Sequence, residues 1–340
     1  MHQDFVAPPM PRTKKGEIRK VGVEIEFSGL DVQVAAECLA QHLGGRIRKI
    51  APHHFIIEDT PFGAVQLELD TRLVKPTETD SPAWQRFDWQ MKQVLGDAAS
   101  VLVPVEMIAP PVPYTDLHHI ARISDILRLA GATGTGHSVI YAFGTHLNVE
   151  VVSLSIEHLY PTLRAYALIE DWLRQVHQID TSRRITTFID PFPQAYRTWL
   201  ANHPATPDTA EFISSYLAHN PTRNRGLDMT PILLSLDQAN VLAALGDGKA
   251  NARPTFHYRL PNSNVDRLDW TLADDWATWV RVEEVAADTD LLETLAKAWL
   301  AEVAASKLPV GLLWSNWLDT IEKILASRGM GMRTLGVAPP

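Results

Sequence analysis

The segment KVGVEIEFS, residues 20–28, alternates apolar and polar side chains with a period of two. Successive side chains of a β-strand point to opposite faces, so this pattern predicts a strand with four apolar residues on one face and Glu24 and Glu26 on the other. The rise per residue places the Cα atoms of these two glutamates about 6.5–7 Å apart. At that separation the two carboxylates can each bind a different cation or flank one between them.

Several later segments repeat this division into an apolar and a polar face. The residues on their polar faces are Glu68, Asp70, Glu106, His146, Asn148, Glu150, His257 and Arg259. An ordinary solvated face of an antiparallel sheet is one reading. However, the set contains no lysine, and so many carboxylates on one face repel one another unless cations neutralise them. Carboxylates with an occasional imidazole suit Mg²⁺ or Mn²⁺, so we predict a metal-binding sheet face.

The spacing of the remaining patterns predicts an α+β fold. Short strands are expected at 46–50, 54–58, 64–69, 103–109, 139–152 and 255–260. Helices are expected at 31–43, 81–95, 115–130, 156–178, 208–217, 236–244, 272–287, 291–304 and 313–327. Hairpin-length connections between the early strands favour an antiparallel sheet with helices packed on its other side. In the helix expected at 272–287, Trp276 and Trp279 are spaced as core residues, and Trp270 just before it is expected to pack with them.

Composition narrows the class of protein. The chain has 340 residues, of which 46% are apolar and 21% charged, which is typical of a globular protein. A single cysteine excludes a disulfide framework. The net charge of −9 makes a nucleic-acid partner improbable. No apolar run approaches about 18 residues and the N-terminal stretch lacks the apolar core of a signal peptide, so we expect a cytoplasmic protein without a membrane partner.

Arginines accompany the acidic strands. Arg259 follows His257 on the same predicted face, and further arginines occur as Arg223, Arg225, Arg183 and Arg184. Arginine is a bidentate donor to phosphate or carboxylate, although each could equally be a solvated or ion-paired residue. Divalent cations and arginines beside a polyanion are the usual arrangement for phosphoryl transfer. The lysine-containing phosphate loop GxxxxGK[ST] is absent from the sequence.

The order of these motifs resembles the amidoligase family, within the carboxylate–amine ligase superfamily that includes glutamine synthetase and glutamate–cysteine ligase. The matching segments, which span about 20 to 265, are VGVEIEF (21–27), VQLELD (65–70), VEMIAPP (105–111), FGTHLNV (143–149), SRR (182–184) and RPTFHYRLPNS (253–263). The resemblance implies a curved antiparallel sheet, similar to the catalytic domain of glutamine synthetase, that holds ATP and two or three Mg²⁺ or Mn²⁺ ions. It further implies transfer of the γ-phosphoryl group to a substrate carboxylate, followed by attack of an amine on the acyl phosphate.

The resemblance also assigns roles to individual residues. Arg259, Glu24 and Glu26 correspond to catalytic residues. The implied metal ligands are Glu24, Glu26, Glu68, Asp70, Glu106, His146 and His257. The implied nucleotide contacts are His146, Asn148, Arg223, Arg225 and Arg259. The implied substrate contacts are Arg183, Arg184, Arg225 and Asn262. The expected partners are a small-molecule or peptide carboxylate and an amine, and an oligomeric assembly is left open.

On this resemblance the chain divides into three parts: a flexible N-terminal arm (1–19), a catalytic domain (20–265) with a helical insertion at about 155–250, and a C-terminal helical region (266–340) packed on the same domain. One departure from the family is clear. The late strand is usually E-x-R with a metal-binding glutamate, whereas this chain has His257-Tyr258-Arg259. Two alternatives therefore remain: a metal-dependent phosphotransferase or hydrolase on the same sheet, or a nucleotide-binding member without turnover.

Overall fold

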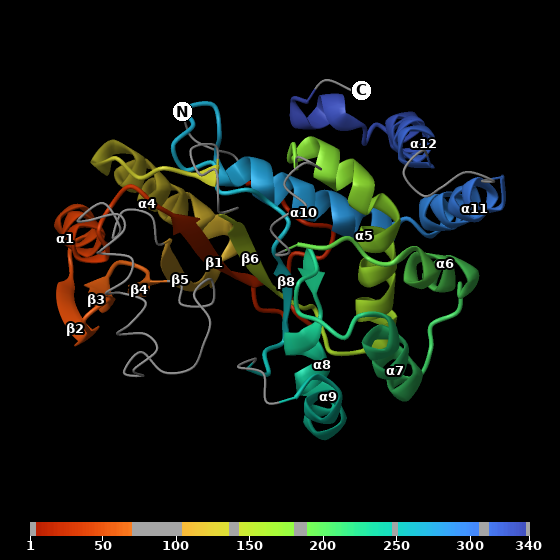
Figure 1. Ribbon diagram of the computed structural model, residues 1–340, viewed down its shortest axis with the longest axis horizontal. Coiled ribbons are helices and arrows are strands. Elements are labelled where there is room, and N and C mark those ends of the chain that lie inside the picture. The colour runs from red at the N-terminus through yellow and green to blue at the C-terminus, as the bar shows by residue number, and fades with distance from the viewer. Residues whose placement is uncertain are drawn as a thin grey trace, which may run out of the picture.

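A computed structural model describes residues 5–69, 104–135, 143–179, 189–246, 251–305 and 313–337. Its centre is one antiparallel sheet of eight strands in the order β2-β3-β4-β5-β1-β6-β8-β7 (Figure 1). The strands in that order are β2 (Arg46–Ala51), β3 (His54–Thr60), β4 (Gly63–Leu69), β5 (Val105–Pro113), β1 (Lys20–Phe27), β6 (Thr145–Glu150), β8 (Thr255–Tyr258) and β7 (Leu227–Asp228). The α+β class and the antiparallel sheet predicted from the sequence are confirmed.

The register of the strands decides which polar residues are neighbours. Glu26 of β1 lies opposite Glu106 of β5, which in turn lies opposite Glu68 of β4. On the other side of β1, Glu24 lies opposite His146 of β6. The residues predicted to form one polar face are therefore adjacent across the ladder as well as along each strand.

The opposite face of the sheet is apolar and covered by helices. The four alternate residues of β1, Val21, Val23, Ile25 and Phe27, are fully buried. Helices α1 (Val32–Leu43) and α4 (Leu117–Ala130) pack over β3, β4 and β5, and the aromatic rings of β8 pack against α10 (Leu272–Ala287) and α5 (Ile156–Val176). Figure 1 shows α1, α4 and α10 along one side of the sheet. Burial of this apolar face against helices holds the layers together.

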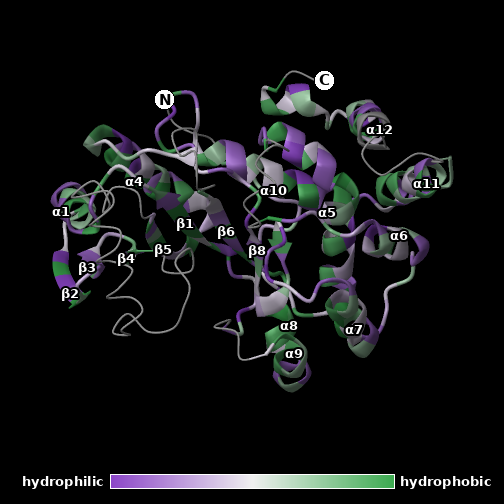
Figure 2. Ribbon diagram, viewed as in Figure 1, coloured by the Kyte–Doolittle hydropathy of each residue, from purple (hydrophilic) through white to green (hydrophobic). Residues whose placement is uncertain are grey.

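The remaining helices lie beyond β8 and around it. They are α6 (Gln194–Asn202), α7 (Thr209–His219), α8 (Thr230–Leu236), α9 (Gln238–Leu245), α11 (Thr289–Ala305) and α12 (Leu313–Ser327), with short 3₁₀ turns at Tyr114–Asp116 and Met332–Leu335. Helices α11 and α12 pack against each other and against α5. Figure 2 shows hydrophilic and hydrophobic residues alternating along α1, α7 and α12, as amphipathic helices require.

The N-terminal stretch contacts the C-terminal part of the chain. The carbonyl of Val6 accepts a hydrogen bond from the indole of Trp276 at 2.7 Å. Arg19 is almost fully buried and forms a two-point ion pair with Glu283 of α10 at 2.7 and 2.8 Å. These contacts link residues 5–19, predicted as a flexible arm, to α10. Trp270, Trp276 and Trp279 are buried, as expected for core residues.

Two element boundaries differ from the prediction for local reasons. Strand β5 continues through Pro110 and Pro111 to Pro113, because the ladder with β1 is irregular between Val21 and Val23 and prolines are tolerated at bulges. Of the strand expected at 139–152, residues 139–142 lie outside the described residues, and β6 spans Thr145–Glu150. The helix expected at 236–244 is α9, which begins at Gln238 because the carboxylate of Asp237 caps it. Neither α6 nor α8 was predicted from the sequence. The helix expected at 81–95 lies outside the described residues.

Candidate active site on the polar face of the sheet

The centre of the polar face is a buried group of carboxylates and imidazoles. Two sets of three side chains bring possible ligand atoms within 4.8 Å of one another: Glu24, His146 and His257, and Glu26, Glu106 and His146. All five residues are buried. The prediction that these residues meet on one face of the sheet is therefore confirmed.

Glu24 is the residue on which the first set is built. Its Oε1 accepts a hydrogen bond from Asn148 Nδ2 and its Oε2 accepts one from His146 Nδ1, each at 2.9 Å. Burial by itself raises the pKa of Glu24, but these two hydrogen bonds and the imidazoles of His146 and His257 outweigh burial and hold that pKa well below its ordinary value. The carboxylate is thus ionised at neutral pH in a site that water barely reaches.

His257 is held by a carboxylate that the sequence analysis did not select. Its Nδ1 lies 3.4 Å from Oδ2 of Asp228 on the adjacent strand β7. Burial raises the pKa of Asp228, but the hydrogen bond from His257, together with Arg223 and Thr230, lowers it to about 2. An ionised carboxylate only accepts hydrogen bonds, so the proton of the neutral His257 ring resides on Nδ1 and Nε2 carries a lone pair.

The ring of His257 is neutral at pH 7. Burial lowers its pKa to about 4 despite the opposing effect of Asp228 and Glu24, and Arg259 also lowers it. Its Nε2 lies 3.9 Å from Glu24 Oε2 and has no hydrogen-bond partner among the described residues. Oδ1 of Asn148, the residue opposite His257 on β6, is likewise buried without a partner there. Two unpartnered acceptors beside an ionised carboxylate are what a bound cation would satisfy.

The second set lies on the other side of His146. The Nε2 of His146 is 3.8 Å from Oε1 of Glu26, and Oε2 of Glu26 accepts a hydrogen bond from the backbone N–H of Gly144 at 2.8 Å. A Cβ atom at position 144 would lie 2.6 Å from His146 Nε2. The glycine of the FGTH segment therefore gives the imidazole room to lie beside Glu26. The donors of both sets are oxygen and imidazole nitrogen, which fit a divalent cation such as Mn²⁺ or Mg²⁺.

The other predicted site residues are distributed around this cluster. Glu68 lies opposite Glu106 but is more exposed, and it belongs to neither set of three. Arg259 donates to the carbonyl of Arg223 at 2.8 Å, while its Nε has no partner among the described residues. The Nε of Arg223 lies 3.3 Å from Asp228 Oδ2. These contacts place both arginines beside the pair formed by His257 and Asp228.

Two predicted residues, Arg225 and Asn262, make other contacts, and three more lie outside the described residues. Arg225 is buried and donates to Asn220 and to the carbonyl of Pro191, at 2.9 and 2.6 Å. Asn262 donates to the carbonyl of His177 at 3.0 Å. None of these contacts involves a residue of the acid–imidazole cluster. Asp70, Arg183 and Arg184 lie outside the described residues.

Asp228 could not be selected by periodicity. Strand β7 has only two residues, and a period-two pattern needs at least four to be recognised. The one local signal was its place three residues after Arg225 in a segment already marked by arginines.

Comparison with known proteins adds one match. A family model described as "Putative amidoligase enzyme" matches residues 17–281. The match includes every residue of the cluster described above and ends within α10, before α11 and α12. No curated protein and no solved structure shows significant similarity to the chain.

Proposed function

Because this chain belongs to the amidoligase family, we propose that it is an ATP-dependent ligase that joins a carboxylate to an amine. The observation that carries the proposal is the buried cluster of Glu24, Glu26, Glu106, His146 and His257 at the centre of the sheet. Three carboxylates gathered with two imidazoles in a buried position are costly unless cations balance them. The family and the donor set together favour a metal–nucleotide site.

In the proposed reaction, a carboxylate oxygen of the acid substrate attacks the γ-phosphorus of ATP and ADP leaves. The nitrogen of the amine then attacks the acyl carbon, inorganic phosphate leaves and the amine loses a proton. The five residues of the cluster would hold Mg²⁺ or Mn²⁺, and a bound divalent ion supplies neutralisation of phosphate charge. Arg259 would donate to the phosphoryl group during transfer, because a guanidinium offers several donors in a fixed plane.

Asp228 has a positioning role in this proposal. It holds His257 in the tautomer whose Nε2 lone pair faces Glu24, as carboxylates commonly do for metal-binding imidazoles. The late strand of the family usually carries a metal-binding glutamate where this chain has the neutral His257. The carboxylate of Asp228 on the adjacent strand β7 supplies the negative charge that this difference removes. We propose that the site binds metal through His257 and keeps its anionic balance through Asp228.

Several finer points remain part of the proposal. They are the similarity of the fold to the catalytic domain of glutamine synthetase, the three-part domain division at 19/20 and 265/266, and the roles of Glu68, Asp70, Arg183, Arg184, Arg223, Arg225, Asn148 and Asn262 in binding metal, nucleotide or substrate. A cytoplasmic location is likewise proposed. Among the described residues, no helix combines the length and apolar character needed to cross a membrane.

The first experiment is calorimetric titration of ATP into the purified protein, with and without Mg²⁺ or Mn²⁺. We expect metal-dependent binding in the wild type and its loss in Glu26→Ala. Glu58→Ala is the matched control, because Glu58 is a carboxylate of the same sheet that pairs with Arg48 outside the cluster. Absence of binding with every metal would overturn the proposal.

A second measurement separates the ligase from its alternatives. ADP release is followed with candidate acids, with and without an amine. A ligase produces amide only when both are present. Phosphorylated product without an amine would indicate a phosphotransferase, metal-dependent hydrolysis without ATP would indicate a hydrolase, and nucleotide binding without any turnover would indicate a binding protein.

A further inference from the structure

A cavity of about 770 Å³ lies between the C-terminal end of α5, the first two turns of α10 and the 3₁₀ turn at Met332–Leu335. None of the residues lining it belongs to the acid–imidazole cluster. Its apolar lining includes Val176, Ala277, Leu335 and Val337. The volume falls within the range of about 300–1,000 Å³ that small-molecule sites occupy. The cavity is therefore large enough for an organic ligand.

Two buried polar atoms face this cavity. Asp275 and His177 line it and are only 2% and 9% exposed. Oδ1 of Asp275 lies 3.7 Å from Nδ1 of His177, which is too long for a hydrogen bond. Neither atom has a hydrogen-bond partner among the described residues, and neither is fully enclosed by protein. A group of the size of a water molecule can therefore touch each of them from the cavity.

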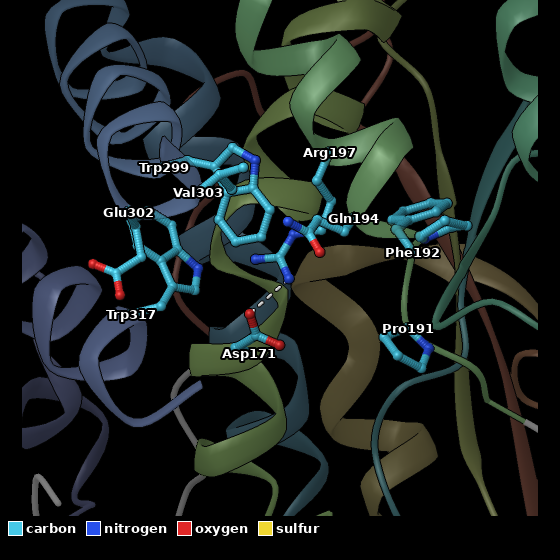
Figure 3. Close-up of a pocket in the computed structure, with 10 residues that line it drawn as sticks. Asp171, Pro191, Phe192, Gln194, Arg197, Trp299, Glu302, Val303 and Trp317 are labelled. Atoms are coloured by element: carbon cyan, nitrogen blue, oxygen red, sulfur yellow. Dashed lines mark ion pairs between the residues drawn. The ribbon is translucent and has the colours of Figure 1, made fainter. Parts of the chain in front are cut away.

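The ion pair of Arg197 and Asp171 differs in this respect. It lies beside a smaller cavity of about 180 Å³ among α5, α6, α11 and α12 (Figure 3). Nη1 of Arg197 is 2.7 Å from Oδ2 of Asp171, and the other polar atoms of the pair, Nε, Nη2 and Oδ1, are fully enclosed. This pair joins α6 to α5 and presents no polar atom to a ligand.

Hydrogen bonds behind His177 decide which of its nitrogens carries the proton. Burial lowers the pKa of His177 to about 3, so the ring is neutral at pH 7. Its Nε2 lies 2.9 Å from the Tyr258 hydroxyl and 3.0 Å from the Thr278 hydroxyl, and Thr278 donates to the carbonyl of Asp275. Every proton of this group has an acceptor if Tyr258 donates to Thr278 and Nε2–H donates to Tyr258. Nδ1 then presents its lone pair to the cavity, beside the carboxylate oxygen.

Charge selects the class of ligand. Three carboxylates, of Asp269, Asp274 and Asp275, line the cavity with one guanidinium, of Arg267, which pairs with Asp269. The indole of Trp270 donates to Oδ2 of Asp275, and Oδ1 is left for a ligand. Burial and the nearby Asp274 raise the pKa of Asp275 well above its ordinary value, because its ionised form has no cation beside it. A cationic ligand would supply that charge, whereas an anion would add to the repulsion.

We propose that this cavity is a binding site for a primary alkylammonium ion. The ammonium group donates one hydrogen bond to Oδ1 of Asp275 and one to Nδ1 of His177, and the alkyl chain packs against the apolar lining. A nitrogen at ordinary hydrogen-bond distances of about 2.9 Å can contact both atoms at their separation of 3.7 Å. A hydroxyl group has one hydrogen and would satisfy only one of the two acceptors. The site uses no residue of the acid–imidazole cluster, so it does not depend on the proposed ligase activity.

The test is titration of the full chain with n-pentylamine at pH 8, in EDTA, without nucleotide and in a buffer free of primary amines. Calorimetry and saturation-transfer NMR follow the binding. We expect saturation with a dissociation constant on the order of 1 mM or lower. The matched probes are 1-pentanol, which lacks the charge, and N,N,N-trimethylpentylammonium, which keeps the charge but has no N–H. Each should bind at least about tenfold more weakly. Absence of pentylamine binding, or equal binding of the trimethyl compound, would overturn the proposal.

Asp275→Asn then assigns the binding to this cavity. It removes the charge at nearly constant shape and should weaken pentylamine binding at least about tenfold. Because the folded chain already favours the neutral carboxyl group at this position, the circular dichroism spectrum should be retained. Asp269→Asn is the control: it removes an equal charge from the same cavity, at a residue that pairs with Arg267, and should keep the affinity within about threefold.

His177→Phe provides a second route that leaves Asp275 unchanged. The phenyl ring takes the place of the imidazole without Nδ1, and the hydroxyls of Tyr258 and Thr278 can still bond to each other. Pentylamine binding should weaken at least about fivefold. Unchanged affinity in this variant, or in folded Asp275→Asn, would refute the site.

Discussion

His257 Nδ1 lies 3.4 Å from Asp228 Oδ2 across the ladder between β8 and β7. This contact joins an imidazole on β8 to a carboxylate on β7, the last strand of the sheet. The opposite ring nitrogen, Nε2, faces Glu24 at 3.9 Å. Asp228 on the edge strand is therefore connected through His257 to Glu24 in the acidic cluster.

Asp228→Asn is expected to lower the affinity for Mn²⁺ by about 10–100-fold, which is typical when a carboxylate that orients a metal-binding histidine is neutralised. Asparagine retains an oxygen that can accept from the backbone of Thr230, so the fold should persist. Calorimetry measures the affinity and circular dichroism the fold. Asp290→Asn, on the exposed surface of α11, is the control. An unchanged Mn²⁺ affinity would exclude the positioning role.

The two imidazoles predict a preference for Mn²⁺ over Mg²⁺ of at least about tenfold, because nitrogen ligands favour the later divalent metals. The double variant His257→Glu/Asp228→Asn replaces the imidazole ligand on β8 with a carboxylate and leaves the net charge of the pair unchanged. It should lower the ratio of Mn²⁺ to Mg²⁺ affinity. Competition followed by the electron paramagnetic resonance of Mn²⁺ measures the ratio. If Mg²⁺ displaces Mn²⁺ equally well from the wild type and this variant, His257 is not a ligand.

Arg259→Lys is expected to reduce turnover about 100-fold or more while ATP affinity changes only a few-fold, because the guanidinium contributes most to the transition state. Steady-state rates and calorimetry separate the two quantities. Arg267→Lys is the control, because it makes the same substitution at an exposed arginine that pairs with Asp269. Equal losses of ATP affinity and turnover would make Arg259 a binding residue only.

Gly144→Ala tests the room that His146 requires. The added Cβ would lie 2.6 Å from Nε2 of that ring, so the imidazole must move away from Glu26. We expect Mn²⁺ affinity to fall at least about tenfold, by analogy with other changes that disturb metal-ligand orientation. Gly22→Ala is the control, since its Cβ would meet Asn148 at an ordinary 3.5 Å. Retained affinity in Gly144→Ala would mean that the second set of ligands tolerates displacement of His146.

Stability should depend on pH through His158. Burial, together with the positive charges of Arg19 and Lys14, lowers its pKa to about 4. Between pH 6.5 and 4 the unfolded chain binds a proton at this position and the folded chain does not. The free energy of unfolding therefore falls as the pH falls through this window, by up to about 1.4 kcal/mol per pH unit from this group.

His158→Gln removes that titration while its side-chain oxygen can still accept from the backbone of Val152. Urea unfolding at pH 4.5, 5.5 and 6.5 should give a shallower loss of stability than in the wild type. If the free energy of unfolding of the variant falls with pH as steeply as that of the wild type, other groups account for the pH dependence.

The sequence by itself determined the two faces of the central strands. Alternation is a local property of an extended chain, so Glu24 and Glu26 had to share a face opposite Val23 and Ile25 once the segment formed a strand. The same reasoning selected Glu106, His146 and His257 before any pairing was known. Their order along the chain was enough to indicate the family.

Only the tertiary structure decided which of these residues contact one another and which residues hold them in place. Strand order and register bring Glu24 beside His146, and they place Asp228 beside His257 from a two-residue strand too short to show any period. The pairing of Arg197 with Asp171 depends on how α6 packs against α5, which no local pattern reports. Periodicity predicts the direction of a side chain, whereas its partners depend on long-range packing that the local pattern does not contain.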